Sequence, residues 1–343
     1  MMTQRATTSL EETNVEKEGL VGKRIWQGRY LIALVFGIAL PLMASGQASD
    51  YPNRPIQIVI PFGPGAVNTA CLILAEKMSE SLGQPMVMIN KPGAGGAIGT
   101  ASVATAPADG YTLLAAVPAF ITLPLSGDVP YKRTDFVPIG QFARSSHYLI
   151  VKEDFPAKSL GELFALVSKR PGEIAYGGSG VGGNAYLLIE NLKLSRKLDT
   201  QFIPYPVETA AITAVLGGHI QFAIVSATAV AGQLKSGVVR ALATISTERD
   251  PWLPSVPTAT EQGYPELAAS VYFTLLAPAK TPSSVIKKLE AAMERAVQDK
   301  QVQEKLSTAS TTTLFRTGAD VTVFFDAEEK KWADIGKRVG SGR

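Results

Sequence analysis

The stretch that decides the fold reads Ile56-Gln57-Ile58-Val59-Ile60, then Pro61-Phe62-Gly63-Pro64-Gly65-Ala66-Val67-Asn68, then Thr69 to Gly83. The first segment is a short β-branched run, which is typical of a buried strand. The second is an uncharged loop, and the third has apolar residues at near-helical spacing before Gly83, where a helix would end. The backbone N–H groups that open such a helix point at one place, and the helix dipole adds roughly half a positive charge there. The stretch therefore predicts an anion or carboxylate site made of backbone.

The remaining chain supplies further strands and helices and a second loop of the same kind. The run Glu173–Tyr176 enters a glycine-rich loop over 177–183, and residues 184–192 have a helical pattern. Alternating strands and helices favour an α/β fold with doubly wound sheets. We expect two lobes, one from residues 49–148 plus 270–343 and the other from 149–269. The two glycine-rich loops would face each other across a cleft.

Residues 1–48 have the pattern of a secretory signal peptide. Lys23, Arg24 and Arg29 precede an apolar run over 31–43, and small residues follow up to Ala48. The apolar run is shorter than the roughly 20 residues that a membrane-spanning helix needs. We expect cleavage near Ala48 and export to the periplasm.

Composition excludes several classes of partner. The formal net charge is +3, and no basic run or basic–aromatic pattern is present. Nucleic acid is therefore not an expected partner. One cysteine, Cys71, cannot form an internal disulfide, and it lies in an apolar helical segment typical of the core. The two histidines, His147 and His219, have no acidic or cysteine neighbour at ligand spacing, so we expect neither a metal site nor a catalytic residue.

An enzymatic interpretation rests on one motif. Gly178-x-Gly180-x-x-Gly183 satisfies the dinucleotide-binding pattern, and Asp199 follows 21 residues after the first glycine. No second motif for a reacting substrate accompanies it, and the same loop suits a carboxylate held by backbone N–H groups. We therefore expect no cofactor, and keep a nucleotide-dependent enzyme as the alternative.

Several motifs together resemble a known family. They are Pro61-Phe62-Gly63-Pro64-Gly65, Asn90-Lys91-Pro92-Gly93-Ala94-Gly95-Gly96, Asp109-Gly110-Tyr111-Thr112-Leu113-Leu114, Leu216-Gly217-Gly218, Val256-Pro257-Thr258 and Leu275-Leu276-Ala277-Pro278. Their order is similar to that in the tripartite tricarboxylate transporter solute receptors, also called Bug or TctC-like periplasmic binding proteins. The resemblance covers essentially all of 51–340. It implies a two-lobed type II periplasmic binding fold with a hinge, no catalysis, and delivery of a small carboxylate to the membrane subunits of a transporter. A monomer is expected.

The chain departs from the family pattern at charged positions. Asn68 or Thr69 occupies the place of an Asp, and Leu72 or Ile73 the place of an Arg. In the second lobe Tyr186 stands where a His is expected, and Pro204-Tyr205-Pro206-Val207 replaces Pro-Tyr-Lys-Gly. These changes predict a ligand whose tail is uncharged, such as a monocarboxylate or an aromatic acid. A degenerate receptor without ligand is a further alternative.

The predicted ligand-binding residues lie in the two glycine-rich loops and at the ends of neighbouring strands. They are Phe62, Gly63, Gly65, Ala66, Asn68, Thr69, Pro118, Ala119, Ser179, Gly180, Gly183, Asn184, Tyr205 and Ser226.

Overall fold

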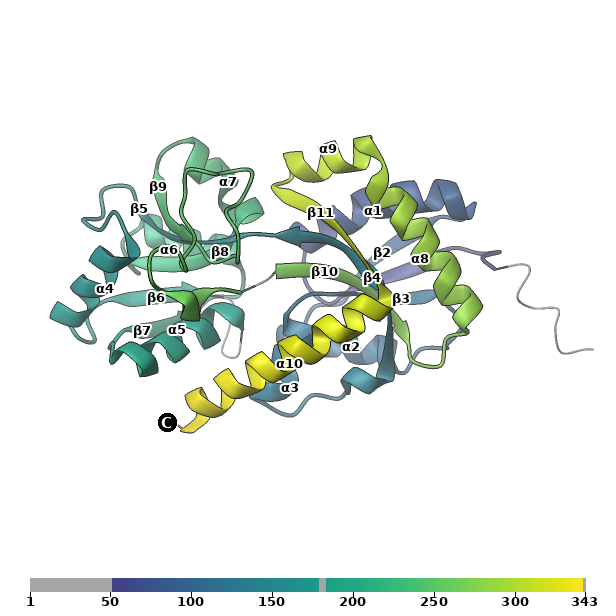
Figure 1. Cartoon of the computed structure of the whole chain (residues 1–343), viewed down its shortest axis with the longest axis horizontal. Coiled ribbons are helices and arrows are strands. Elements are labelled where there is room, and N and C mark those ends of the chain that lie inside the picture. The colour runs from purple at the N-terminus through teal and green to yellow at the C-terminus, as the bar shows by residue number, and fades with distance from the viewer. Residues whose placement is uncertain (1–50, 179–182, 270, 342–343) are drawn as a thin grey trace, which may run out of the picture. The chain divides into compact units, whose positions relative to one another are not determined.

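The computed structural model describes residues 51–178, 183–269 and 271–341, and these form two β-sheets covered by helices (Figure 1). The predicted α/β architecture is confirmed. The predicted signal peptide lies outside the described residues. Within the described part, no helix combines the length and the apolar character needed to cross a membrane.

Sheet A has six strands in the order β11-β4-β10-β3-β1-β2. Its strands are β1 (Ile56–Ile60), β2 (Met86–Asn90), β3 (Thr112–Ala116), β4 (Phe136–Ser145), β10 (Val271–Pro278) and β11 (Thr311–Thr317). The strands β1, β2 and β3 are parallel, as predicted. In contrast, β10 runs antiparallel to β3 and β4, and β11 antiparallel to β4. Sheet A is therefore mixed because the chain returns to it after building the second sheet.

Sheet B has five strands in the order β7-β6-β8-β5-β9. They are β5 (His147–Lys152), β6 (Ala175–Gly178), β7 (Gln201–Pro204), β8 (Phe222–Ser226) and β9 (Val239–Thr244). Here β6, β7 and β8 are parallel, whereas β5 runs antiparallel to β8 and β9. Its helices are α4 (Leu160–Lys169), α5 (Asn184–Arg196), α6 (Glu208–Leu216) and α7 (Ala227–Lys235), with a short 3₁₀ turn η3 (Pro265–Leu267).

The helices that accompany sheet A come from both ends of the described chain. They are α1 (Ala66–Leu82), α2 (Ala97–Ala104), α3 (Ala119–Ser126), α8 (Ser283–Gln298), α9 (Lys300–Thr308) and α10 (Gly318–Ser341), with 3₁₀ turns η1 (Ala94–Gly96) and η2 (Arg133–Asp135). Helix α1 ends as predicted at Gly83, which adopts a left-handed conformation with φ 70° and donates its N–H to the Ser79 carbonyl at 2.9 Å. The inner face of α1 packs into the core, and Cys71 lies there fully buried, as expected.

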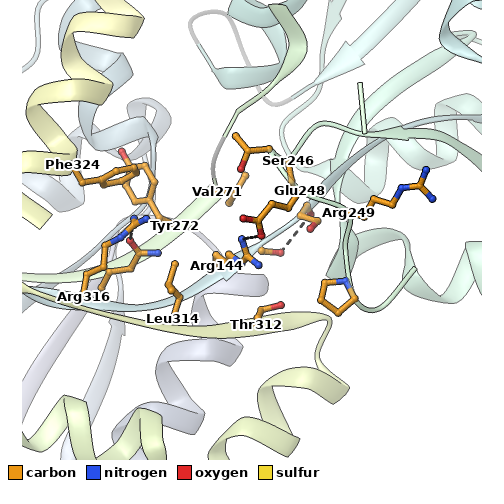
Figure 2. Close-up of a pocket in the computed structure, with 15 residues that line it drawn as sticks. Arg144, Ser246, Glu248, Arg249, Val271, Tyr272, Thr312, Leu314, Arg316 and Phe324 are labelled. Carbon is orange, nitrogen blue, oxygen red and sulfur yellow. Dashed lines mark hydrogen bonds and ion pairs between the residues drawn. The ribbon is translucent and has the colours of Figure 1, made fainter. Parts of the chain in front are cut away.

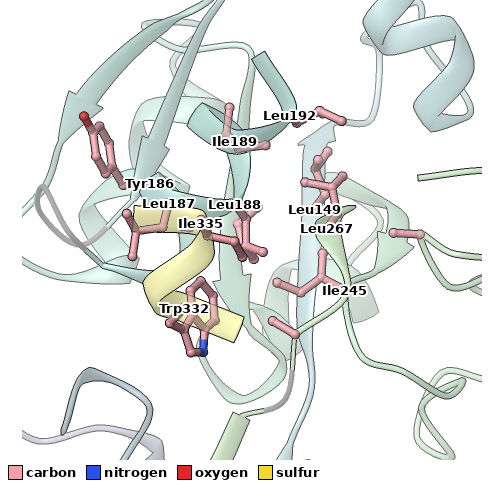
Figure 3. Packing of buried hydrophobic residues seen from close by; sticks show 14 of the residues in the cluster. Leu149, Tyr186, Leu187, Leu188, Ile189, Leu192, Ile245, Leu267, Trp332 and Ile335 are labelled. Carbon is pink, nitrogen blue, oxygen red and sulfur yellow. The ribbon is translucent and has the colours of Figure 1, made fainter. Parts of the chain in front are cut away.

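Helix α10 contacts strands of sheet A and helix α5 of sheet B. Phe325 in its first half packs against Tyr272 of β10, with ring centroids 5.6 Å apart. In its second half Trp332 and Ile335 belong to the same buried cluster as Leu187 and Leu188 of α5 (Figure 3). Residues 270–343 are assigned by the sequence to the first lobe, but α10 also packs against α5, which belongs to sheet B.

Candidate functional site

The loops that follow the parallel strands of sheet A lie at one edge of that sheet. Because β1 pairs with both β2 and β3 in parallel register, the segments after Ile60 and after Ala116 are neighbours. Eight predicted site residues lie in these two segments. They are Phe62, Gly63, Gly65, Ala66, Asn68 and Thr69 at the start of α1, and Pro118 and Ala119 at the start of α3. The structure thus brings the predicted first-lobe residues to one edge.

The N-terminus of α1 has no side-chain partner of its own. Its N-cap is Gly65, no side-chain cap bond is present, and its first turn contains no acidic residue. The helical ladder begins with the N–H of Thr69, which donates to the Gly65 carbonyl at 3.0 Å. The N–H groups of Ala66, Val67 and Asn68 precede this bond, so they are the orphan donors that every helix start presents. They can therefore donate to an anion.

Close packing fixes the position of the loop before α1. The Phe62 ring lies against Gly96, where an added Cβ would be 3.0 Å from the ring tip. Asn90 donates its side-chain N–H to the Phe62 carbonyl at 2.8 Å. An added Cβ at Gly99 would lie 2.7 Å from the Pro61 backbone. Gly96 and Gly99 thus let the segment after β2 approach the loop before α1. An added Cβ at Gly63 would meet no neighbouring atom.

In sheet B, the loops that follow the parallel strands β6 and β7 form a second group at the carboxyl ends of the strands. Ser179 and Gly180 lie outside the described residues. Gly183 is the N-cap of α5, again without a side-chain cap bond and without an acidic first turn, and Asn184 is the first helical residue. Tyr205 donates its N–H to the Gly178 carbonyl at 3.0 Å. Its partly buried ring lies against Gly177, so this tyrosine connects the ends of β6 and β7.

Ser226 is engaged in a polar network of the protein itself. Its hydroxyl accepts the Ala229 N–H as the N-cap of α7 and donates to Glu208 Oε2 at 2.5 Å. Its backbone N–H also donates to Glu208 Oε2, at 3.1 Å. On the other side of the carboxylate, His147 Nε2 lies 3.2 Å from Glu208 Oε1. Sequence spacing missed this network, because His147 and Glu208 are 61 residues apart.

The Glu208 carboxylate is held in its charged form. Burial by itself would raise the pKa of Glu208, but the hydrogen bonds from His147 and Ser226 outweigh it and lower the pKa below its ordinary value. A carboxylate can only accept hydrogen bonds, so His147 Nε2 carries the proton toward it. His147 Nδ1 is buried and makes no hydrogen bond in the described structure. The first turn of α6 therefore carries a negative charge of the chain itself, and this carboxylate is bound by Ser226 and His147.

The described residues around these loops offer recognition chemistry and no nucleophilic chemistry. Cys71 is the one free thiol, and burial raises its pKa strongly, which keeps it protonated. His147 lies opposite Ser226 across β5 and β8, but its Nε2 is paired with Glu208, and the Ser226 hydroxyl donates to the same carboxylate. Backbone donors at α1 and α5, with the Tyr205 ring nearby, suit the binding of a small anion with a less polar tail.

The comparisons with known proteins identify the family. A family described as the tripartite tricarboxylate transporter family receptor matches residues 71–341. Protein BugT of Bordetella pertussis is 36% identical over 310 residues, covering 89% of this chain and 94% of BugT.

Solved structures agree with that match. The periplasmic binding protein BugD has a TM-score of 0.76 and 31% identity, covering 84% of this chain and 99% of BugD. The R. palustris protein Rpa4515, solved with adipate, has a TM-score of 0.79 and 28% identity, covering 85% of this chain and 99% of its own. The predicted two-lobed periplasmic binding fold is thereby confirmed. The chain belongs to the tripartite tricarboxylate transporter receptors, a family of solute-binding proteins that are not enzymes.

Proposed function

We propose that this receptor captures a small carboxylate between its two lobes and delivers it to the membrane subunits of a tripartite tricarboxylate-type transporter. The observation that carries the proposal is the pair of uncapped helix starts. Both α1 and α5 begin at a glycine, without a side-chain cap and without an acidic residue in the first turn. Ser159 caps α4 and Asp299 caps α9, whereas α2, α3, α6 and α8 also start without a side-chain cap. It is therefore the position of α1 and α5 after the two glycine-rich loops predicted to bind an anion that distinguishes them. A carboxylate bound at α1 or α5 would replace the missing cap.

The ligand's far end would be uncharged. Two apolar residues near Tyr205 in sequence are exposed, Ile203 at 36% and Val207 at 52%. We call Ile203, Tyr205 and Val207 the apolar wall, because they can offer apolar contact to a ligand. Glu208, the next residue, carries a negative charge that would repel a second ligand carboxylate placed against α6. The relative solved with adipate supports a carboxylate ligand. The sequence of this wall supports a monocarboxylate or an aromatic acid over an amino acid or a tricarboxylate.

The setting of this function follows from the family. Receptors of this family are periplasmic, and the signal-like residues 1–48 support export of this chain with cleavage near Ala48. We further propose a monomer whose lobes, 49–148 plus 270–343 and 149–269, close about the crossings near 148–151 and 270–276.

A binding screen tests the proposal. Purified protein is titrated with benzoate, adipate, malate, citrate and glutamate, and thermal unfolding is followed in parallel. A ligand present at 100 times its dissociation constant should add about 2.7 kcal/mol to the free energy of unfolding. Benzoate, which has one carboxylate and an apolar tail, is expected to bind more tightly than citrate or glutamate. Tight binding of citrate or glutamate would overturn the uncharged-tail proposal, and no binding by the whole series would favour a degenerate receptor.

Closure is tested on the same complex. The radius of gyration from small-angle scattering should decrease when the carboxylate that binds in the screen is added. An unchanged radius at saturating ligand would contradict closure while leaving the binding result intact.

A further inference from the structure

A cavity of about 120 Å³ lies beside the crossing from β4 to β5, apart from the loops described above. Its walls come from β4, β10 and β11 of sheet A, from residues 246–251 after β9, and from Phe324 of α10 (Figure 2). In sheet A the strand β11 is at the opposite edge from β1 and β2, and in sheet B the strand β9 is at the opposite edge from β6 and β7. None of the predicted ligand-binding residues within the described part of the chain lines this cavity.

Arg316 is a positive charge in the cavity wall that two neighbouring side chains contact. It pairs with Gln141 across β11 and β4, and its guanidinium donates to Gln141 Oε1 at 2.8 Å. The guanidinium carbon also lies 4.6 Å from the Phe324 ring centroid, in a cation–π contact. Gln141 is only 1% exposed, and its own amide donates to the Ala143 carbonyl at 3.2 Å. The Arg316 side chain is therefore held from two sides before any ligand arrives.

No carboxylate of the described residues forms an ion pair with Arg316. The other arginines of the cavity do have such partners. Arg144 pairs with Glu248 at 3.0 Å, and Arg249 points away from the cavity toward Glu261 (Figure 2). One positive charge in this wall is consequently uncompensated. A guanidinium has five N–H donors in a rigid fork, and the hydrogen bond to Gln141 is the one that Arg316 is seen to make with a side chain.

Hydroxyl groups line the same space. Ser246 follows β9 of sheet B, and Thr312 lies on β11 of sheet A. Hydroxyls can donate to an oxyanion, and an arginine fork matches two oxygens of such an anion. We propose that this cavity is a second anion site, which binds a small tetrahedral oxyanion such as phosphate or sulfate through Arg316, with Thr312 and Ser246 as additional donors. The site is separate from the carboxylate cleft.

Calorimetry with inorganic phosphate tests the site at constant ionic strength, with sodium chloride as the reference salt. The full exported protein should bind one phosphate. Arg316→Gln should weaken phosphate binding at least about tenfold, because it removes a charge-assisted pair of hydrogen bonds. The matched control is Arg170→Gln, which removes the same charge from an exposed pair with Glu173 and should leave phosphate binding unchanged. Thr312→Val, which preserves the shape of the side chain, should weaken binding by about two- to fivefold.

The outcomes separate this site from the proposed cleft. Benzoate, used as the cleft probe, should neither compete with phosphate nor lose affinity in Arg316→Gln. The proposal would be overturned if phosphate bound no more tightly than chloride, if phosphate affinity were unchanged in Arg316→Gln, or if benzoate displaced phosphate. Should Arg316→Gln fail to fold, Thr312→Val decides, and wild-type phosphate affinity in that variant would count against the site. The phosphate result does not depend on whether the cleft binds a carboxylate.

Discussion

The loop edges of the two sheets are built from similar elements but treat negative charge differently. At the edge of sheet A, α1 begins at an uncapped glycine, and its first turn has no acidic residue. At the edge of sheet B, α7 is capped by Ser226, and the first turn of α6 holds Glu208. The start of α1 therefore leaves its backbone donors open and carries no negative charge, whereas at sheet B a side chain caps α7 and a glutamate stands in the first turn of α6.

This difference gives the proposed ligand a direction. An incoming carboxylate finds unused N–H groups at α1, and at α5 where sheet B also leaves a helix start uncapped. Near α6 it meets the charged Glu208 and the exposed side chain of Val207. A ligand with one charged end and one apolar end would satisfy both conditions, whereas a ligand charged at both ends would not.

Displacing the loop before α1 should have the largest effect on stability and on carboxylate binding. In Gly99→Ala the new Cβ would lie 2.6 Å from the Lys91 carbonyl and 2.7 Å from Pro61 Cα. Both are backbone atoms, so the loop before α1 must move, at a cost of about 2–3 kcal/mol of unfolding free energy. Denaturant unfolding and carboxylate titration would show lower stability and at least about tenfold weaker binding. The control is Gly232→Ala in α7, where an added Cβ meets nothing. If both variants behave alike, close packing does not hold the loop.

Removing the charge of Glu208 should reduce the free energy of unfolding by slightly less. Glu208→Gln keeps the shape but loses the charge that receives the bonds from His147 and Ser226, which we expect to reduce stability by about 1.5–2 kcal/mol at pH 7. The folded pKa of Glu208 is lowered, so its stabilisation is present above the ordinary glutamate pKa and is lost as the pH falls through the folded pKa. Unfolding curves of wild type and variant should therefore converge in acid.

The matched control for Glu208 is Glu173→Gln, which removes a carboxylate from an exposed pair with Arg170. Its effect should stay below about 0.5 kcal/mol. A constant gap between Glu208→Gln and wild type at every pH would mean that Glu208 contributes through packing alone.

Adding a negative charge to the first turn of α1 should make this helix start resemble that of α6, which contains Glu208. Asn68→Asp places a carboxylate in the first turn of α1, where it can accept the helix's own N–H groups. We expect binding of a monocarboxylate to weaken by about tenfold, or 1.4 kcal/mol, because the ligand loses donors and meets a like charge. Asn68→Ser, which is neutral, serves as the control. Calorimetry that gives Asn68→Asp the wild-type affinity would place the ligand elsewhere.

The smallest expected effect concerns the apolar wall. Val207→Ala removes two methyl groups from a side chain that is 52% exposed, so affinity for an aromatic acid should fall only about two- to fourfold. Val238, which is 43% exposed and immediately precedes β9, provides the control: Val238→Ala should not change this affinity. Equal losses for benzoate and for acetate in Val207→Ala would show that this valine does not contact the ligand's tail.

The regular elements were predictable from local patterns. The strand over 56–60, the helix ending at Gly83 and the helix over 184–192 depend on neighbours in sequence, and the structure contains each of them. Helix α3 was not predicted, because Pro124 lies inside it and its apolar residues run almost continuously. The antiparallel strand β11 was also missed. Its run of threonines has no marked alternation, and its pairing with β4 is a long-range event.

The candidate site also contains features that the sequence predicts and features that it does not. Helix starts and glycine loops could be located from sequence, because capping is a local matter. The network of Glu208 with His147 could not, since strand pairing brings His147 opposite Ser226 and only then near α6. Arg316 was missed for a similar reason, because its partner Gln141 precedes it by 175 residues.

The long last helix has a consequence for how such a molecule can move. Residues near Phe325 are packed on β10, and Trp332 and Ile335 share a buried cluster with α5. Pulling the two layers straight apart would expose the Trp332 indole, which is fully buried and donates to Glu328. We therefore expect α10 to resist separation of the two layers, because separation would remove this buried contact.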